Sequence, residues 1–321
     1  MTDYYDRYEK RAPRSREASL LRDLRGILNV AKSRAGALRL QLRDIDIDSL
    51  KTRGDLARIP VMRAAELEER QKQMPPFGGA SATRPAALRR LLMAAPHRFQ
   101  PQGHAKDWWS AARALFAAGI RKGDVVLNCF SYHFGADGHM IDSGCTALGC
   151  PVIPAGSDDV EKTLAVIEHY APNAYCGPAD FLKRLLEAAK DRYGIEAIRI
   201  AFFSAADLST EAKSNLAIRN IKTYEAYATP ELGVVAYETE ARDALVVNEG
   251  LLVEIVRPGT GEPLPVGQRG EIVVTRLNAD YPLLRFGTGT LSAIVPGQSP
   301  CGRTNMRLKH PVEPGEKSSL A

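Results

Sequence analysis

The sequence predicts an α/β protein in which a mainly parallel sheet is layered with helices and followed by a smaller β-rich lobe. From about residue 88 to residue 232, short apolar segments rich in β-branched residues alternate with segments of helical spacing. This alternation is typical of a parallel sheet that is buried on both faces. After Gly233 the helical spacing stops, and residues 251–256 and 271–276 alternate as antiparallel strands do.

The individual elements follow in order along the chain. Residues 4–72 are expected to be helical, because leucine and isoleucine recur at helical spacing between Leu20 and Leu28. Prolines and glycines then predict a loop at 75–85. The body is expected to contain strands at 91–95, 125–130, 151–154, 173–176, 198–204 and 223–227, and helices at 107–119, 140–148, 160–170, 181–190 and 210–218. Asp107 is placed to cap the first of these helices.

These elements predict four segments. We expect a helical leader at 1–75, an α/β body at 76–235, a β-rich lobe at 236–309 and a disordered polar tail at 310–321. The 321 residues are 45% hydrophobic and 25% charged, as in an ordinary globular protein. Apolar runs such as 198–206 are too short to cross a bilayer.

Charge and cysteine usage exclude several classes of site. Residues 1–106 hold 22 Lys and Arg against 12 Asp and Glu, a surplus of ten. A basic segment can attract nucleic acid, an anionic membrane or a phosphate-rich cofactor. No arginine cluster alternates with aromatic residues, however, so solvated helix faces are favoured and no nucleic-acid or membrane partner is expected. The five cysteines form no C-x-x-C pair, are odd in number and follow no apolar leader, which predicts reduced thiols in the cytoplasm and no structural zinc.

One stretch near the C-terminus carries a recognisable motif. Residues 285–291 read Arg-Phe-Gly-Thr-Gly-Thr-Leu and resemble the R-[FY]-x-T-G-D-L motif of the phenylacetate–CoA ligase family of adenylate-forming enzymes. Four further stretches match that family in order and spacing, at 55–60, 123–135, 149–156 and 224–231. The resemblance therefore covers nearly all of residues 1–309 and implies the large N-terminal domain of such a ligase.

The resemblance also implies roles for particular residues. Tyr227 would stack on adenine, Ala228 and Thr229 would present the turn to the nucleotide, and Glu231 would be catalytic and hold Mg²⁺. The alternative is that Tyr227 and Glu231 belong to a strand end packed in the core. The remaining expected contacts are Ser204, Ala205, Arg285 and Thr290 for the nucleotide, and Tyr132, His133, Phe134 and Gly135 for an acid pocket.

The sequence departs from the family pattern at several of these places. Thr290 replaces the aspartate that grips the ribose hydroxyls, and Pro230 replaces a hydroxyl residue. Ala206 stands where a glutamate is usual, and residues 94–101 replace the Ser/Thr/Gly-rich phosphate loop. The family continues after 301–309 with a C-terminal domain of about a hundred residues, a typical small-domain size; here the sequence ends at residue 321.

Two functions follow from this combination. The first is activation of an aryl or arylacetic acid through an acyl-adenylate, with ATP or AMP, Mg²⁺ and CoA as ligands, impaired by Thr290 and by the absent domain. The second is a non-catalytic remnant or truncated product that binds acyl or nucleotide ligands. The expected protein partner is a second copy of the chain or a separate chain that supplies the C-terminal domain.

Overall fold

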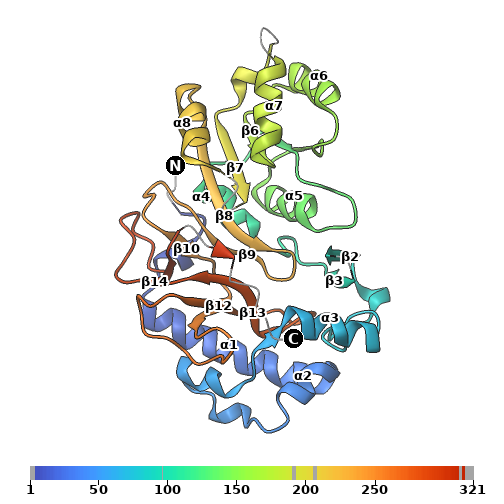
Figure 1. Cartoon of the computed structure of the whole chain (residues 1–321), viewed down its shortest axis with the longest axis vertical. Helices are drawn as coiled ribbons and strands as arrows, with labels where there is room; N and C mark the ends of the chain where they lie inside the picture. The colour runs from blue at the N-terminus through green and yellow to red at the C-terminus, as the bar shows by residue number, and fades with distance from the viewer. Residues whose placement is uncertain (1–3, 96, 190–192, 205–207, 311–312, 315–321) are drawn as a thin grey trace. The chain divides into compact units, whose positions relative to one another are not determined.

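The computed structural model describes residues 4–95, 97–189, 193–204, 208–310 and 313–314 (Figure 1). The chain forms two compact units. Unit 1 consists of Met1–Asp6 and Ala105–Asn248, and unit 2 consists of Arg7–His104 and Glu249–Ala321. The expected division at 76 and 236 therefore differs from the observed one. The helical leader and the β-rich lobe, far apart in sequence, belong to the same unit.

Unit 1 is built on a largely parallel sheet, as the sequence predicts. Its strands run in the order β10-β9-β8-β7-β6-β4-β5, parallel from β5 to β8 and antiparallel from β8 to β10. The strands are β4 (Val126–Asn128), β5 (Val152–Pro154), β6 (Ala174–Cys176), β7 (Ile200–Ser204), β8 (Lys222–Thr229), β9 (Gly233–Tyr237) and β10 (Leu245–Val247). The helices are α4 (Ala111–Ala117), α5 (Asp137–Leu148), α6 (Val160–Tyr170), α7 (Ala179–Ala189) and α8 (Thr210–Ile218), with a 3-10 turn at Ile195–Ala197.

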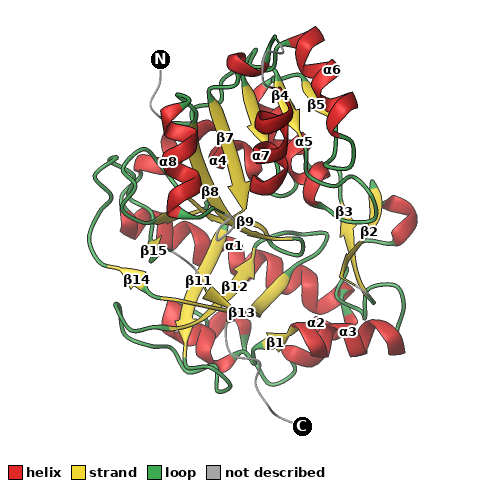
Figure 2. Cartoon of the chain, turned by 45° about the horizontal axis from the view of Figure 1, so that its top comes forward, coloured by secondary structure: helices red, strands yellow, loops and turns green. Residues whose placement is uncertain are grey.

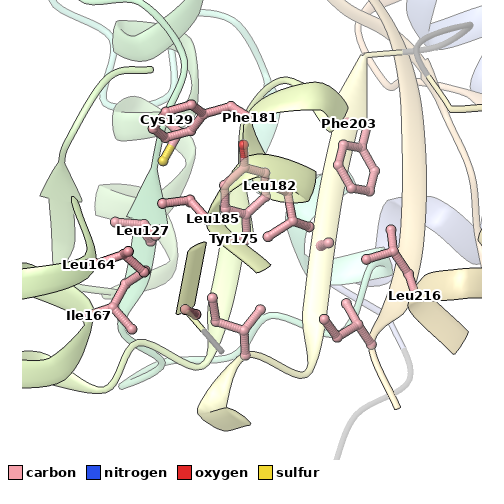
Figure 3. Close-up of a cluster of buried hydrophobic side chains, with 14 of the residues drawn as sticks. Leu127, Cys129, Leu164, Ile167, Tyr175, Phe181, Leu182, Leu185, Phe203 and Leu216 are labelled. Carbon is pink, nitrogen blue, oxygen red and sulfur yellow. The ribbon is translucent and has the colours of Figure 1, made fainter. Parts of the chain in front are cut away.

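Helices α6, α7 and α8 cover one face of this sheet. Their apolar residues pack with side chains of β4, β6 and β7 in a single buried cluster (Figure 3). Leu127, Tyr175 and Phe203 are each fully buried in it, and the Tyr175 hydroxyl donates to Pro178 O over 2.7 Å. Burial of this apolar surface is the main force that holds the three helices on the sheet.

Helix α5 covers the opposite face. Asn128 alternates with Leu127 along β4, so its side chain points to the other side of the sheet. There its Nδ2 donates to Gly138 O of α5 over 2.9 Å. Gly144 of α5 lies so close to α4 that an added Cβ would approach the Ala111 backbone to 2.9 Å. Helix α4 begins at Ala111, later than the expected start at 107, and Ser110 is its N-cap residue. The Asp107 carboxylate still satisfies the first turn, because it accepts from Ala111 N and Ala112 N at 2.9 Å.

Unit 2 packs the helical leader against a mainly antiparallel sheet, in which only the short strand β1 pairs in parallel among the described strands (Figure 2). The sheet order is β1-β13-β12-β11, with β16 on β13, β14 paired with β15, and a separate β2–β3 hairpin. The strands are β1 (Met62–Arg63), β2 (Arg90–Ala95), β3 (Arg98–Gln102), β11 (Leu251–Val256), β12 (Gly270–Arg276), β13 (Leu283–Ser292), β14 (Ile294–Val295), β15 (Arg307–Leu308) and β16 (Glu313–Pro314). The helices are α1 (Pro13–Arg34), α2 (Gly36–Gln41) and α3 (Ala64–Gln73), with 3-10 turns at Arg7–Lys10, Ile47–Ser49, Arg53–Arg58 and Pro85–Ala87.

The leader is fixed to the sheet by side chains that reach backbone carbonyls. Arg53 Nη1 donates to Val253 O over 2.8 Å, and Gln41 Nε2 donates to Leu284 O over 3.1 Å. Leu24 and Leu28 of α1 are fully buried, as their spacing predicts. These contacts explain why residues 7–104 and 249–321 form one unit instead of two.

Two sequence expectations differ from the structure of unit 2. The segment after 91–95 is the second strand of a hairpin, β3, although Pro101 lies within it. Proline is tolerated there because the sheet has only two strands, so both are edges. Within the tail expected to be disordered, Glu313 and Pro314 pair with Leu291 and Thr290; residues 311–312 and 315–321 lie outside the described residues.

Among the described residues, none of the helices combines the length and apolar character needed to span a bilayer. Four of the five cysteines are buried, and Cys301 is half-buried. Burial raises the pKa of Cys129, Cys145, Cys150 and Cys176, which keeps these thiols protonated.

Candidate active site

Unit 1 contains a cavity at the carboxyl ends of its parallel strands. Ser204 is the last residue of β7, Thr229 is the last residue of β8, and Phe130 follows β4. Open α/β sheets bind ligands at this edge. The cavity has a volume of about 70 Å³ and is lined by Phe130, Asp137, Met140, Ile141, Phe202, Phe203, Ser204, Ala226, Ala228, Thr229, Pro230 and Val234. Its wall is thus largely apolar, with three polar side chains.

The turn between β8 and β9 is held in place from both sides. Thr229 Oγ1 accepts from Leu232 N over 3.2 Å, and Trp109 Nε1 donates to Pro230 O over 3.2 Å. Gly233 has a φ of 79°, and a Cβ added to it would lie 2.4 Å from Trp109 O. Only glycine combines this conformation with this approach. The turn therefore presents Glu231 from a fixed backbone.

Replacing Gly233 with alanine is expected to disturb this turn strongly. The added methyl group would overlap Trp109 O, and overpacking of this kind costs about 1–3 kcal/mol of unfolding free energy. Gly250 supplies a matched control, since its φ is also 79° but a Cβ added to it would meet nothing within 4 Å. Chemical denaturation of G233A and G250A separates the two effects. An equal loss in both variants would show that the contact with Trp109 is unimportant.

Two carboxylates lie at this end of the sheet. Glu231 is only 3% exposed, whereas Asp137 lines the cavity and is exposed to solvent. Burial among the cavity atoms raises the pKa of Asp137, and the negative charge of Glu231 raises it further. The two acidic groups are therefore electrostatically coupled, and a cation bound there would relieve their repulsion.

The carboxylate oxygens at this end of the sheet suit Mg²⁺ when nucleotide phosphates supply further ligands. No group of three or more acidic, His or Cys side chains that could hold a metal occurs in the described part of the chain. Mg²⁺ prefers oxygen ligands and is commonly held by one or two carboxylates together with substrate phosphates. The Glu231 carboxylate suits that arrangement.

The residues expected to form the acid wall differ in burial and in hydrogen bonding. The Tyr132 hydroxyl donates to Asp142 Oδ1 over 2.6 Å and accepts from Asn128 Nδ2 over 2.7 Å. His133 is exposed and lies 3.4 Å from Asp158 Oδ2, and the Phe134 side chain is 76% exposed. None of these side chains, nor Gly135, lines the cavity described above. Their role in acid binding stays a prediction.

The structure brings together part of the expected nucleotide set. Ser204, Ala228 and Thr229 line the same cavity, whereas Tyr227 is buried in β8 and does not line it. Burial of Tyr227 agrees with the core-packing alternative raised from the sequence. Ala205 falls outside the described residues.

The Arg285 side chain is buried in unit 2, where it bonds to other residues of that unit. Its guanidinium pairs with Glu254 at 3.0 and 3.1 Å and donates to the carbonyls of Ala57, Ile59 and Gly261 at 3.3, 2.7 and 2.6 Å. All five N–H donors of the side chain are thereby used. This geometry favours a buried structural ion pair over the ribose contact that the resemblance implies.

Thr290 lies in β13, and side chains hold the backbone around it. Its N–H donates to Thr288 Oγ1 over 3.2 Å, and Gly289 N donates to Glu271 Oε1 over 3.2 Å. Glu271 also forms an ion pair with Arg63. The Thr290 side chain is half-buried.

Sequence reasoning missed the apolar residues of the cavity and Asp137. Asp137, Met140 and Ile141 share one face of α5, since they are spaced by three and four residues. That spacing was visible in the sequence. Which face of the helix meets the strand ends depends on the packing of α5 against β4, which the sequence does not state.

Comparison with known proteins agrees with this architecture. The chain is 27% identical over 278 residues to the phenylacetate-coenzyme A ligase of Aromatoleum evansii, covering 81% of this chain and 61% of that protein. It is 31% identical over 196 residues to the phenylacetate-coenzyme A ligase of Pseudomonas putida, covering 58% and 44%. The chain thus matches less than two thirds of the length of these relatives.

Solved structures share the fold. An open conformation of 2-hydroxyisobutyryl-CoA ligase, in complex with 2-HIB-AMP and CoA, superimposes with a TM-score of 0.88 at 23% identity and covers 97% of this chain and 72% of that one. The AMP-binding enzyme family matches residues 104–278, which include the cavity, the β8–β9 turn and both carboxylates. The chain belongs to the AMP-binding enzyme family.

Proposed function

We propose that the protein activates a carboxylic acid with ATP to form an acyl-adenylate, as the first half of an AMP-forming acid–CoA ligase reaction. The observation that carries this proposal is the cavity at the strand ends, whose wall includes the turn that presents Glu231. An aryl or arylacetic acid is the proposed substrate class, supported by the names of the relatives.

Each residue in the proposal has a physical task. The apolar cavity wall excludes water from the acid and strengthens electrostatic interactions there. Glu231 would hold Mg²⁺, which neutralises phosphate charge when it is bound with ATP. Backbone groups at Ser204 and Ala228 would border the nucleotide. The same proposal includes transfer of the acyl group to CoA. It also includes a cytoplasmic location, which is supported by five cysteines that remain thiols in the described part of the chain.

The test is acid-dependent exchange of radiolabelled pyrophosphate into ATP by the full chain. With phenylacetate and Mg²⁺, exchange above the acid-free rate is expected. Absence of exchange, together with absence of acid binding by calorimetry, would remove the proposed function.

A second candidate is a protein that binds acyl or nucleotide ligands without turnover. The observation that favours it is Thr290, because a hydroxyl cannot match a carboxylate that accepts from both ribose hydroxyls. Ligand binding without pyrophosphate exchange would support this candidate over the first.

Changing Thr290 to aspartate is expected to tighten nucleotide binding. A charge-assisted pair of hydrogen bonds is worth about 2–3 kcal/mol, or some tens-fold in affinity. The dissociation constants of ATP and AMP, measured by calorimetry, check this expectation. Thr260→Asp is the matched control, since Thr260 lies exposed in a turn of the same unit. Equal affinities in T290D and the unmodified chain would show that residue 290 does not face the ribose.

A further inference from the structure

A groove between helices α7 and α8 of unit 1 is much larger than the cavity at the strand ends. Its volume is about 560 Å³, and it shares no lining residue with that cavity. The buried side chains of Leu208 and Leu216 contribute to an apolar floor, and charged side chains stand along both rims. The groove is therefore a separate feature of the unit, with the mixed character of a protein-binding surface.

The two ends of the groove carry different charges. Helices α7 and α8 each connect two parallel neighbours of the sheet, so their first residues lie at the same end of the groove. That end carries the acidic Asp180 and Glu211 together with the small Ala212. The opposite end carries Ile218 and the basic Arg219. One end is thus acidic and recessed, and the other is basic with a large apolar side chain.

The side chains that distinguish these ends are available for contacts. At 81% exposure, Ile218 is the most exposed large apolar side chain in the described part of the chain. Asp180, Glu211 and Arg219 are exposed and form no ion pair with other described residues. By contrast, Glu187 on the rim of α7 pairs with Lys183 of the same helix at 4.0 Å.

The exposed side of α8 is complementary to itself when a second copy runs in the opposite direction. Glu211, Asn215 and Arg219 are spaced four residues apart, so they share one side of the helix, with each charge about 6 Å along the axis from Asn215. A two-fold axis at Asn215 places Arg219 of the second copy beside Glu211, and the reverse. It also places Ile218 of the second copy beside Ala212. Opposite charges then meet, and the exposed apolar side chain enters the recessed end.

We propose that the groove between α7 and α8 is the contact surface of a two-fold homodimer, in which α8 of one copy packs antiparallel to α8 of the other. A two-fold contact uses the same patch on both copies, so this self-complementary surface closes the assembly at two chains. A nine-residue helix and one groove form a small interface, for which we expect a dissociation constant of about 1–100 µM. The inference goes beyond the proposed function and does not depend on it.

The test is analytical ultracentrifugation of the full chain from about 1 µM to about 1 mM, a range that brackets this affinity. The mass should rise from that of one chain to that of two. Ile218→Ser should weaken the dimer about a hundredfold, since the lost apolar contact is worth about tenfold and occurs twice. Val266→Ser is the matched control, because Val266 is 61% exposed and belongs to unit 2. Its dissociation constant should equal that of the unmodified chain.

An exchange of charges tests the antiparallel arrangement. Glu211→Arg and Arg219→Glu should each weaken the dimer about tenfold or more, because like charges then face one another. The double variant E211R/R219E restores opposite charges and should recover most of the affinity. Glu161→Arg is the control for a reversed charge in a first helical turn, since Glu161 is exposed at the start of α6 outside the groove. Circular dichroism verifies that each variant remains folded.

Three outcomes would overturn the inference. The mass of a single chain throughout the concentration range would show that this surface does not bind a second copy. Unchanged association in I218S would place the contact elsewhere on the molecule. A double variant no tighter than the single ones would exclude the antiparallel pairing of Glu211 with Arg219. Pyrophosphate exchange is measured separately, so each of these results leaves the proposed acid activation standing.

Discussion

Replacing Arg285 with alanine is expected to cost about 3–5 kcal/mol of unfolding free energy, because removal of one partner leaves a buried charge without compensation. Both side chains of the Arg285–Glu254 pair are nearly inaccessible, at 1% and 4% exposure. Burial already raises the pKa of Glu254, with Arg285 opposing that shift. The variant would also leave the Ile59 and Gly261 carbonyls without this donor.

Chemical denaturation of the full chain measures this loss. Arg257→Ala is the control within the same unit, since the Arg257–Glu262 pair is 60% and 65% exposed and such surface pairs contribute about 0–1 kcal/mol. Arg285→Lys should recover only part of the stability, because an ammonium group has three donors in place of a planar set of five. Similar midpoints for R285A and R257A would contradict the structural role of Arg285.

Replacing Glu231 with glutamine is expected to lower the rate of adenylate formation by about 100-fold or more. A metal ion stabilises transition-state charge by several kcal/mol, and each 1.36 kcal/mol corresponds to a factor of ten. Glutamine keeps the size of the buried side chain but removes its charge. The rate is followed by pyrophosphate exchange over a range of Mg²⁺ concentrations, where the variant should require more Mg²⁺ than the unmodified chain.

Glu240→Gln is the control for this loss, since Glu240 is exposed in the same unit and lines no part of the cavity. Circular dichroism verifies that E231Q remains folded. Exchange at the unmodified rate in E231Q would assign Glu231 to the core and not to the metal.

Helices and strands of unit 1 could be predicted from the sequence, because the signals that mark them lie within each segment itself. Residues 160–170 and 210–218 are helices with the predicted bounds, and a polar side chain caps the first turn of each: Asp159 accepts from Lys162 N, and Ser209 accepts from Ala212 N. The strand β3 was missed because Pro101 disfavours a strand unless it lies at an edge. Whether a strand lies at the edge of a sheet depends on its pairing with other segments, and the local sequence does not show that pairing.

The directions of the site side chains could not be predicted in the same way. Residues 131–136 have no helical or strand period, so nothing local shows that Phe134 faces solvent whereas Phe130, at the end of the predicted strand, meets the cavity. Likewise, Arg285 is the first residue of a recognisable motif, but its partner Glu254 is 31 residues away in the sequence. Long-range pairing decides its role.

Calorimetric titration of the full chain with ATP in the presence of Mg²⁺ tests the central claim most directly. We expect saturable binding that requires Mg²⁺, weakens in E231Q and tightens in T290D. The same titration without Mg²⁺ should show much weaker binding, because Glu231 and the phosphates would then repel one another. Absence of ATP binding in millimolar nucleotide with Mg²⁺ would contradict the claim that this AMP-binding fold activates an acid.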